Sequence, residues 1–134
     1  YLDEIEKNAA IILNDNPERG RLYSLQLGLK AIKSNSLFIH NVDSPFVDKE
    51  VIKKLSAYIE KKDVVIPVFE GKGGHPVLVN NVVKKEIINK YNKYITLKDV
   101  FLNFSKKYIE VDNNSILKNI NTPQELEVLC HEFV

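Results

Sequence analysis

Short runs of apolar residues alternate with amphipathic stretches along almost the whole chain. Leucines and an isoleucine recur at helical spacing over residues 20–33, with arginine, glutamine and lysine between them. Continuous apolar runs bounded by turn residues are typical of buried strands instead. This alternation favours an α/β domain: a three-layer, Rossmann-like arrangement in which helices cover a mainly parallel sheet.

The predicted elements follow from these two patterns. We expect strands at residues 9–13, 37–42, 63–69, 76–79, 108–111 and 116–117. We expect helices at residues 20–33, 49–61, 82–93, 97–106 and from 123 onward. Pro67 lacks an N–H donor, which predicts one unpaired side of its strand at that point.

Three of the helix starts carry capping signals. Asp48 offers a side-chain oxygen in front of the helix at 49–61. Thr96 is followed by an acidic residue three positions later, and Thr122 begins a Thr-Pro-Gln-Glu sequence. A threonine with an acidic residue three positions on predicts a capping box, and proline is favoured at the first helical position.

Composition places the chain among ordinary globular domains. It has 134 residues, 44% of them hydrophobic, which is enough for a single domain spanning 1–134 with its own core. Nineteen basic and 18 acidic side chains leave a formal net charge of +1. A balance of this kind predicts neither a nucleic-acid partner nor an anionic membrane surface, and it says nothing about oligomeric state.

Cysteine use and hydropathy narrow the setting. Cys130 is the only cysteine, so no intrachain disulfide is available and a reducing compartment, the cytoplasm, is expected. No apolar run approaches the 18 or so residues that span a bilayer. The chain opens at Tyr1, within a stretch resembling the end of a helix, and we therefore expect it to be part of something longer.

Asp43 is the first candidate for chemistry. It directly follows the apolar run at 37–42 and stands two residues before Pro45. Ligands of open α/β sheets bind at the carboxyl ends of the strands, where a carboxylate can hold Mg²⁺ against phosphates. An aspartate before Ser-Pro can equally cap a turn, so both interpretations stay open.

Gly74, His75 and Pro76 form a second candidate, in a segment that holds three of the five glycines. Glycine lets the backbone approach a ligand closely, and a histidine there presents its ring to that ligand. A flexible hairpin tip explains the same residues. Neither a phosphate-binding P-loop nor a dinucleotide-binding glycine pattern occurs in the chain.

Two further segments combine polar residues with a helix start. Gly20 and Ser24 lie at the beginning of the helix at 20–33, where free N–H groups favour anions. Asn119 and Asn121 precede the last helix, and their amide oxygens either join Asp43 on a metal or cap the turn. We expect His40 to be a hydrogen-bonded core residue.

In this order the motifs resemble those of the MobA-like NTP transferases, the molybdenum-cofactor guanylyl- and cytidylyltransferases and their relatives. The matching segments run from about Ala9 to Leu129 and are Asn16-Pro, Gly20, Ser24, Gly28-Leu29, Asp43-Ser-Pro45, Val65-Ile-Pro67, Gly74-His-Pro-Val-Leu78 and Asn121-Thr-Pro-Gln-Glu-Leu126.

The resemblance implies a function and a set of roles. It implies a Mg²⁺-dependent transferase that moves GMP or CMP from GTP or CTP to a phosphorylated acceptor such as molybdopterin. Asp43 would be the catalytic metal carboxylate and Asn121 a second metal position. Gly20 and Ser24 would lie against the nucleotide. The acceptor would border the segment Gly74, His75 and Pro76.

The chain departs from the family in two respects. Many members have aspartate where Asn119 and Asn121 stand, and an amide adds no negative charge to a metal site. The opening strand and the glycine-rich triphosphate loop of the family are missing, so the chain resembles the carboxyl-terminal part of the enzyme. We therefore expect it to be inactive alone. The alternative is a non-catalytic module that binds a nucleotide or a protein.

Overall fold

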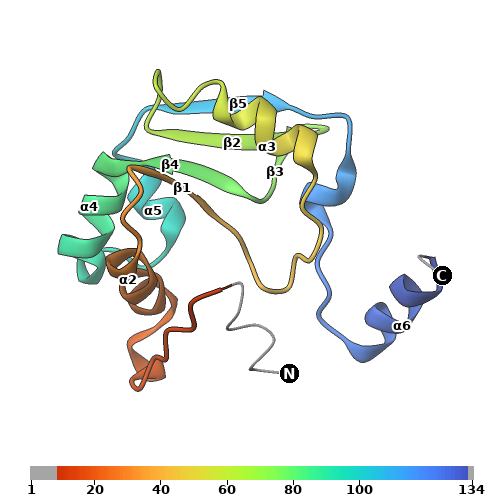
Figure 1. Cartoon of the computed structure of the whole chain (residues 1–134), viewed down its shortest axis with the longest axis horizontal. Helices are drawn as coiled ribbons and strands as arrows, with labels where there is room; N and C mark the ends of the chain where they lie inside the picture. The colour runs from red at the N-terminus through yellow and green to blue at the C-terminus, as the bar shows by residue number, and fades with distance from the viewer. Residues whose placement is uncertain (1–8, 133–134) are drawn as a thin grey trace.

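The computed structural model describes residues 9–132, and in it a five-stranded open sheet lies between helices (Figure 1). Strand β2 pairs with β5 in parallel on one side and with β4 and β3 in antiparallel on the other. β1 pairs antiparallel with the far side of β4. The strands are β1 (Ser36–Ile39), β2 (Val64–Phe69), β3 (Lys72–Gly73), β4 (Val77–Asn80) and β5 (Lys106–Glu110).

The sheet is mixed, and its strand directions define two edges. β1, β2 and β5 all run the same way, while β4 is inserted between β1 and β2 in the opposite direction. The carboxyl ends of β1, β2 and β5 therefore share one edge of the sheet with the amino end of β4. We call this the carboxyl edge and the opposite one the amino edge.

Helices cover both faces of the sheet, which confirms the three-layer α/β architecture. Helices α2, α4 and α5 pack on one face, and α3 packs on the other. The helices are α2 (Arg21–Ala31), α3 (Lys49–Ser56), α4 (Asn81–Lys90), α5 (Leu97–Phe101) and α6 (Pro123–Glu132), with single 3₁₀ turns η1 (Pro17–Arg19), η2 (Tyr91–Lys93) and η3 (Asn114–Leu117).

The two hydrophobic cores follow from the alternation of side chains along the strands. Val77 and Val79 of β4 pack with the helices of one face, whereas Leu78 between them packs with α3. The apolar runs that looked continuous in the sequence thus have both of their faces covered. Burying apolar side chains on both faces is the main source of stability for such a sheet.

The predicted caps are confirmed. The Asp48 side chain accepts a hydrogen bond from the Glu50 N–H at 2.8 Å and begins α3. Thr96 forms a full capping box with Asp99 at the start of α5. The last helix begins in the same way, because the Thr122 Oγ1 accepts from the Glu125 N–H at 3.2 Å while the Glu125 carboxylate accepts from the Thr122 N–H.

Two predicted strands are absent, and three predicted elements are too long: the helices at 49–61 and 97–106 end at Ser56 and Phe101, and the strand at 37–42 ends at Ile39. Residues 9–13 form no strand, and Leu13 is 77% exposed, because no neighbouring strand among the described residues pairs with them. The predicted helix at 97–106 ends at Phe101, and the chain enters β5 at Lys106. The predicted strand at 116–117 is part of η3, where Ile116 is buried as the apolar residue of a single turn.

The expected gap beside Pro67 is present. On one side Pro67 is paired with Ile109 of β5, whereas the ladders with β4 and β3 stop short of it on the other. Its carbonyl is used there by the Gly74 N–H at 2.9 Å.

Helix α6 stands apart from the sheet in Figure 1, and its apolar Leu126 and Val128 are 50% and 60% exposed. Within residues 9–132, no helix is long and apolar enough to span a membrane.

Candidate functional site at the carboxyl edge

Three loops meet at the carboxyl edge of the sheet. The loop at residues 40–48 leaves β1, the segment Gly74 to Pro76 enters β4, and residues 111–122 follow β5. Backbone hydrogen bonds join them: the Ile120 N–H donates to the Asp43 carbonyl at 2.7 Å, and the His75 N–H donates to the Ile116 carbonyl at 3.0 Å. Residues distant in the sequence are thus held around one point.

Asp43 lies in the first of these loops and is half-buried. Its Oδ1 atom is buried and has no hydrogen-bond partner in the described part of the chain. Buried carboxylate oxygens are normally paired, because losing water without a replacement partner is costly. An unpaired oxygen at this edge is therefore available to a water molecule or a ligand.

Ser44 is the most buried polar residue of this loop, at 2% exposure. Its hydroxyl donates to the Asn119 Oδ1 atom at 2.5 Å, and its N–H donates to the Asn41 carbonyl at 3.1 Å. The His40 Nε2 atom is hydrogen-bonded to the Ser44 carbonyl. All of the polar groups of Ser44 are therefore engaged, in contrast to those of its neighbour Asp43.

His40 and His75 face one another beside Asp43, with ring centroids 6.4 Å apart. The Nδ1 atom of each ring is buried and lacks a partner among residues 9–132. Burial lowers the pKa of His75 below its usual value, and the charges of His40 and Arg21 act in the same direction. The Ile39 carbonyl and the Asp43 carboxylate oppose that shift. His75 is therefore held as neutral imidazole at pH 7.

The start of α2 lies close to this group. Gly20 occupies the N-cap position with φ at +83°, a conformation that glycine adopts without strain. The Arg21 guanidinium donates to the Asn41 side chain in the loop after β1. Ser24 lies one turn further along, is exposed, and accepts from the Asn14 side chain at 2.8 Å. The predicted nucleotide-binding segment thus contacts the loop that contains Asp43 through Asn41.

Gly74 is required here for close packing. A Cβ atom at this position would lie 2.2 Å from the Ile116 carbonyl oxygen, so no other residue fits without a backbone shift. Pro76 is buried and follows a cis peptide bond after His75. The segment predicted to border an acceptor is therefore a tightly packed wall, from which only the His75 ring is left partly accessible.

The two asparagines of the last loop have different environments. Asn119 accepts the Ser44 hydroxyl. Asn121 is exposed, and its N–H donates to the Glu125 carboxylate at 2.6 Å in the cap of α6. Because Ile120 between them is bonded to the Asp43 carbonyl, the structure brings Asn121 to within one residue of the Asp43 loop.

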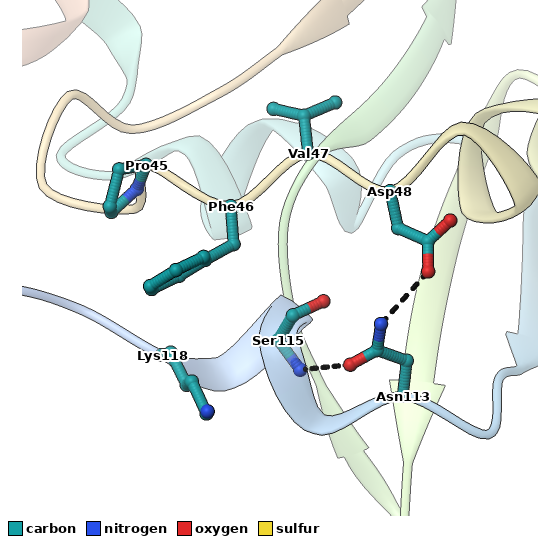
Figure 2. Close-up of a pocket in the computed structure, with 7 residues that line it drawn as sticks. All are labelled: Pro45, Phe46, Val47, Asp48, Asn113, Ser115 and Lys118. Carbon is teal, nitrogen blue, oxygen red and sulfur yellow. Dashed lines mark hydrogen bonds between the residues drawn. The ribbon is translucent and has the colours of Figure 1, made fainter. Parts of the chain in front are cut away.

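Figure 2 shows a pocket of about 440 Å³ beside this group, between the 45–48 segment and η3. Asp48 accepts from the Asn113 side chain at 2.8 Å, which in turn accepts from the Ser115 N–H, and these two bonds form one wall. The Lys118 ammonium lies 5.7 Å from the centre of the Phe46 ring. The pocket is lined by Pro45, Phe46, Val47, Asp48, Asn113, Ser115 and Lys118.

The donor set at the carboxyl edge suits a hard cation bound together with phosphates. Among residues 9–132, no three histidine, cysteine, aspartate or glutamate side chains gather into a metal-binding group. Mg²⁺ is usually held by one or two carboxylates plus the phosphates of a substrate, and it keeps several waters. The buried, unpaired oxygen of Asp43 and the exposed amide of Asn121 fit that requirement.

The bond between Ser44 and Asn119 and the contact between Arg21 and Asn41 are not predictable from the sequence. Both interactions join residues far apart in the chain: Ser44 and Asn119 are 75 positions apart, Arg21 and Asn41 are 20 apart. The one signal in the sequence is that Ser44 is a small polar residue between the candidate carboxylate and an apolar Pro-Phe-Val segment.

The fold and this edge define an α/β domain whose polar loops gather at the carboxyl ends of the strands. The chain belongs to the MobA-like NTP transferase domain family, whose sequence model matches residues 2–100. The match includes Gly20, Ser24, Asp43 and the Gly74 segment, and it ends before Asn119. The chain is therefore a member of a nucleotidyltransferase family.

Solved structures share the fold. Molybdopterin-guanine dinucleotide biosynthesis protein A from Archaeoglobus fulgidus is 16% identical, with a TM-score of 0.67 over 98% of this chain and 74% of its own. The bifunctional IspDF of Campylobacter jejuni is 15% identical, with a TM-score of 0.67 over 94% of this chain. The 2-C-methyl-D-erythritol 4-phosphate cytidylyltransferase of Thermus thermophilus is 14% identical, with a TM-score of 0.65 over 87% of this chain and 71% of its own.

This chain spans 39% of the length of the Campylobacter protein. A search of curated protein sequences gave no match.

Proposed function

We propose that the protein transfers a nucleoside monophosphate from GTP or CTP to a phosphorylated acceptor such as molybdopterin and releases pyrophosphate. One observation carries the proposal: the Asp43 carboxylate lies in the loop that follows β1, with a buried oxygen that no residue of the described chain satisfies. The family and the sheet edge are those of nucleotide-transferring domains.

One bond forms and one bond breaks in the proposed reaction. An oxygen of the acceptor phosphate forms a bond to the α-phosphorus of the nucleotide, and the bond from that phosphorus to the bridging oxygen of the β-phosphate breaks. The bonding pair leaves with pyrophosphate, and no electron transfer is involved. Holding two polyanions in line and reducing their repulsion supply most of the catalysis in such a step.

Asp43 and Asn121 are the residues that would hold Mg²⁺, through one carboxylate and one amide oxygen. When bound, the ion supplies positive charge at the nucleotide phosphates. Asp43 contributes the only full negative charge of this pair, so it has the larger effect on affinity. The amide of Asn121 adds an oxygen donor without charge, and we expect weaker metal binding than in a site with two carboxylates.

We place the nucleotide against the start of α2. Gly20 has no side chain to cap the helix, which leaves the first N–H groups of α2 available to an anion. The Arg21 guanidinium is already held in this direction by the Asn41 side chain. Ser24, on the exposed side of the next turn, would contact the sugar or the base.

We place the acceptor on the other side of Asp43, between the His75 wall and the pocket of Figure 2. Pro45 and Lys118 line that pocket, and each is adjacent in the chain to one partner of the bond between Ser44 and Asn119. The Lys118 ammonium would attract the acceptor phosphate, while the Phe46 ring offers a face for a planar group. The neutral His75 ring would accept or donate one hydrogen bond.

A second function is a non-catalytic module that binds a nucleotide. The observation that favours it is the pair of amides at Asn119 and Asn121, which leaves Asp43 as the single carboxylate of the metal site. Such a module would bind nucleotide with Mg²⁺ but release no pyrophosphate.

The test uses the full-length protein, which is this chain joined to an opening strand and glycine-rich triphosphate loop of the family. With GTP or CTP, Mg²⁺ and molybdopterin, it measures pyrophosphate release, and calorimetry measures nucleotide binding. We expect release in the parent and a loss of about a hundredfold in kcat/KM for Asp43→Asn, about 2.7 kcal/mol. The matched control, Asp112→Asn, removes a carboxylate that is fully exposed in solvent and should change neither quantity.

Binding without release in the parent would favour the module. Equal binding and release in Asp43→Asn would show that Asp43 is only a turn residue.

A further inference from the structure

The bond between Ser44 and Asn119 joins the two loops that carry the proposed metal ligands. The Ser44 hydroxyl donates to the Asn119 Oδ1 atom at 2.5 Å, and one residue further on each side the Ile120 N–H donates to the Asp43 carbonyl at 2.7 Å. These two bonds form a clamp in which two consecutive residues, Asp43 and Ser44, are held against two others, Asn119 and Ile120. Asp43 is within the clamp, and Asn121 is the residue directly after it.

Within residues 9–132, the Ser44 hydroxyl has Asn119 as its hydrogen-bond partner and joins the two loops directly. Ser44 is 2% exposed and its carbonyl is held by His40, so the residue is fixed on both sides of its hydroxyl. Asn119, in contrast, is exposed and belongs to no helix or strand. A loop residue of this kind is ordered mainly by the bond that it makes, and here that bond is the one to Ser44.

We propose that Ser44 is a positioning residue, whose hydroxyl sets the place of Asn121 relative to the Asp43 carboxylate through Asn119. This inference rests on the proposed function, because it assumes that Asp43 and Asn121 bind the same ion. It also gives the two asparagines different roles: Asn121 is the metal ligand, and Asn119 is the hydrogen-bond partner that holds the loop in place. Changing groups that orient metal ligands typically weakens metal binding 10- to 100-fold.

The alternative is that Ser44 only stabilises the fold. A buried hydroxyl that loses its partner destabilises a protein wherever it lies, so a fall in melting temperature does not distinguish the two roles. Metal affinity of the folded protein does distinguish them. The Ile120 amide reports on the clamp itself. Its proton, which is hydrogen-bonded to the Asp43 carbonyl, should exchange with solvent faster once the neighbouring bond is lost.

The experiment measures the binding of Mn²⁺ alone to the full-length protein by electron paramagnetic resonance, below the melting temperature of every variant. We expect Ser44→Ala and Asn119→Ala each to raise the Kd for Mn²⁺ about tenfold, the lower end of that range. The double variant should bind Mn²⁺ no more weakly than either single variant does, because each substitution removes the same bond. Asn119→Asp keeps the acceptor oxygen and should retain at least the parent affinity.

The matched control is Ser105→Ala at the amino edge. The Ser105 hydroxyl also donates to a side-chain oxygen of a distant loop, that of Asp63 at 2.7 Å, so its removal destabilises without touching the site. We expect its Kd for Mn²⁺ to equal that of the parent. Asn119 is exposed, so Asn119→Ala tests the clamp even if Ser44→Ala does not fold.

The possible outcomes separate this inference from the proposed function. If Asp43→Asn abolishes Mn²⁺ binding while Ser44→Ala and Asn119→Ala stay within twofold of the parent, the clamp is structural only. Independent, multiplying losses in the double variant would also overturn it. If Asp43→Asn binds Mn²⁺ as the parent does, the proposed metal site itself is wrong.

Discussion

The two edges of the sheet differ in whether their polar side chains have hydrogen-bond partners. At the amino edge, the Asp63 carboxylate accepts from the Asn80 side chain at 2.8 Å and from the Ser105 N–H and hydroxyl at 3.0 and 2.7 Å. At the carboxyl edge, Asp43 and His75 each keep a buried polar atom without a partner among the described residues.

The contrast is between polar groups whose hydrogen bonds stabilise the fold and polar atoms that are left without a partner in the described chain. Asn80 illustrates the first kind, since its side chain bonds Asp63 and also caps α4 by accepting from the Val82 and Val83 N–H groups. Polar groups of this kind have all of their partners within the protein. The unpaired atoms beside Asp43 are a cost to the fold that bound ligand would offset. Changes at the amino edge should therefore alter stability, and changes at Asp43 should alter binding.

The largest expected effect on stability breaks this division, because it lies at the carboxyl edge. Gly74→Ala places a Cβ atom 2.2 Å from the Ile116 carbonyl oxygen, so the loop or the strand must move. We expect a loss of about 3 kcal/mol in the free energy of unfolding, measured in urea. Gly28→Ala in α2 is the control, since nothing lies within 4 Å of its Cβ and helix propensity should stabilise it slightly. Equal stability of the two variants would contradict the packing role of Gly74.

The next effect concerns Asp63. Asp63→Ala leaves Asn80 and Ser105 without their shared acceptor, and we expect the free energy of unfolding to fall by about 2 kcal/mol. Nucleotide binding should be unchanged, because Asp63 lies at the opposite edge from Asp43. Calorimetric titration beside a urea melt gives both quantities. A variant that keeps its stability but loses nucleotide would reverse the roles of the two edges.

His75→Ala sharpens the comparison within the carboxyl edge. The ring borders the proposed acceptor side and makes no bond that fixes the nucleotide side, so we expect about a tenfold higher KM for the acceptor, about 1.4 kcal/mol. Nucleotide affinity should stay within twofold of the parent. Steady-state kinetics with each substrate varied in turn separates the two. A larger effect on nucleotide than on acceptor would exchange the proposed subsites.

The smallest effect is a dependence of stability on pH. The Ser105 hydroxyl, with Asn80, lowers the pKa of Asp63 below its ordinary value of 3.8, so the folded carboxyl binds fewer protons than the unfolded one. The stabilisation is complete above the ordinary value and disappears as the pH falls through the folded pKa. Melting temperatures from pH 6 to 2 should therefore fall less steeply in Asp63→Asn than in the parent. Parallel curves would mean that the folded pKa of Asp63 is not lowered.

Local signals were sufficient for the helix starts and for the central strands, but they did not show which distant residues would be in contact. The caps at Asp48 and Thr122 involve residues at most three positions away, so the sequence contains the whole interaction. Residues 9–13 read as a strand by composition, but a strand forms only where a neighbour pairs with it. Ile116 was predicted to lie in a strand because it is apolar. In the structure its side chain is buried in a single turn, against the segment around Gly74.

The same limit applies to the candidate site. Asp43 lies in the loop after β1, as the local pattern of an apolar run followed by an acidic residue predicts, but four residues beyond the end of the strand at Ile39. The roles of Asp43, Asn121, Gly20, Ser24 and the Gly74 segment stay predictions. Ser44 escaped notice because its importance comes entirely from Asn119, 75 positions later. Only the folded chain shows that these residues are neighbours.

The reversed direction of β4 has a consequence for how the length of this sequence can vary. The segment at 74–76 is tied to the sheet at both ends, by β3 directly before it and by β4 directly after it. The turn before β3, in contrast, lies in solvent at Glu70 and Gly71, both of which have positive φ. Insertions should therefore be tolerated at 70–71 and rejected between Gly73 and Val77, where one extra residue would shift two strands at once.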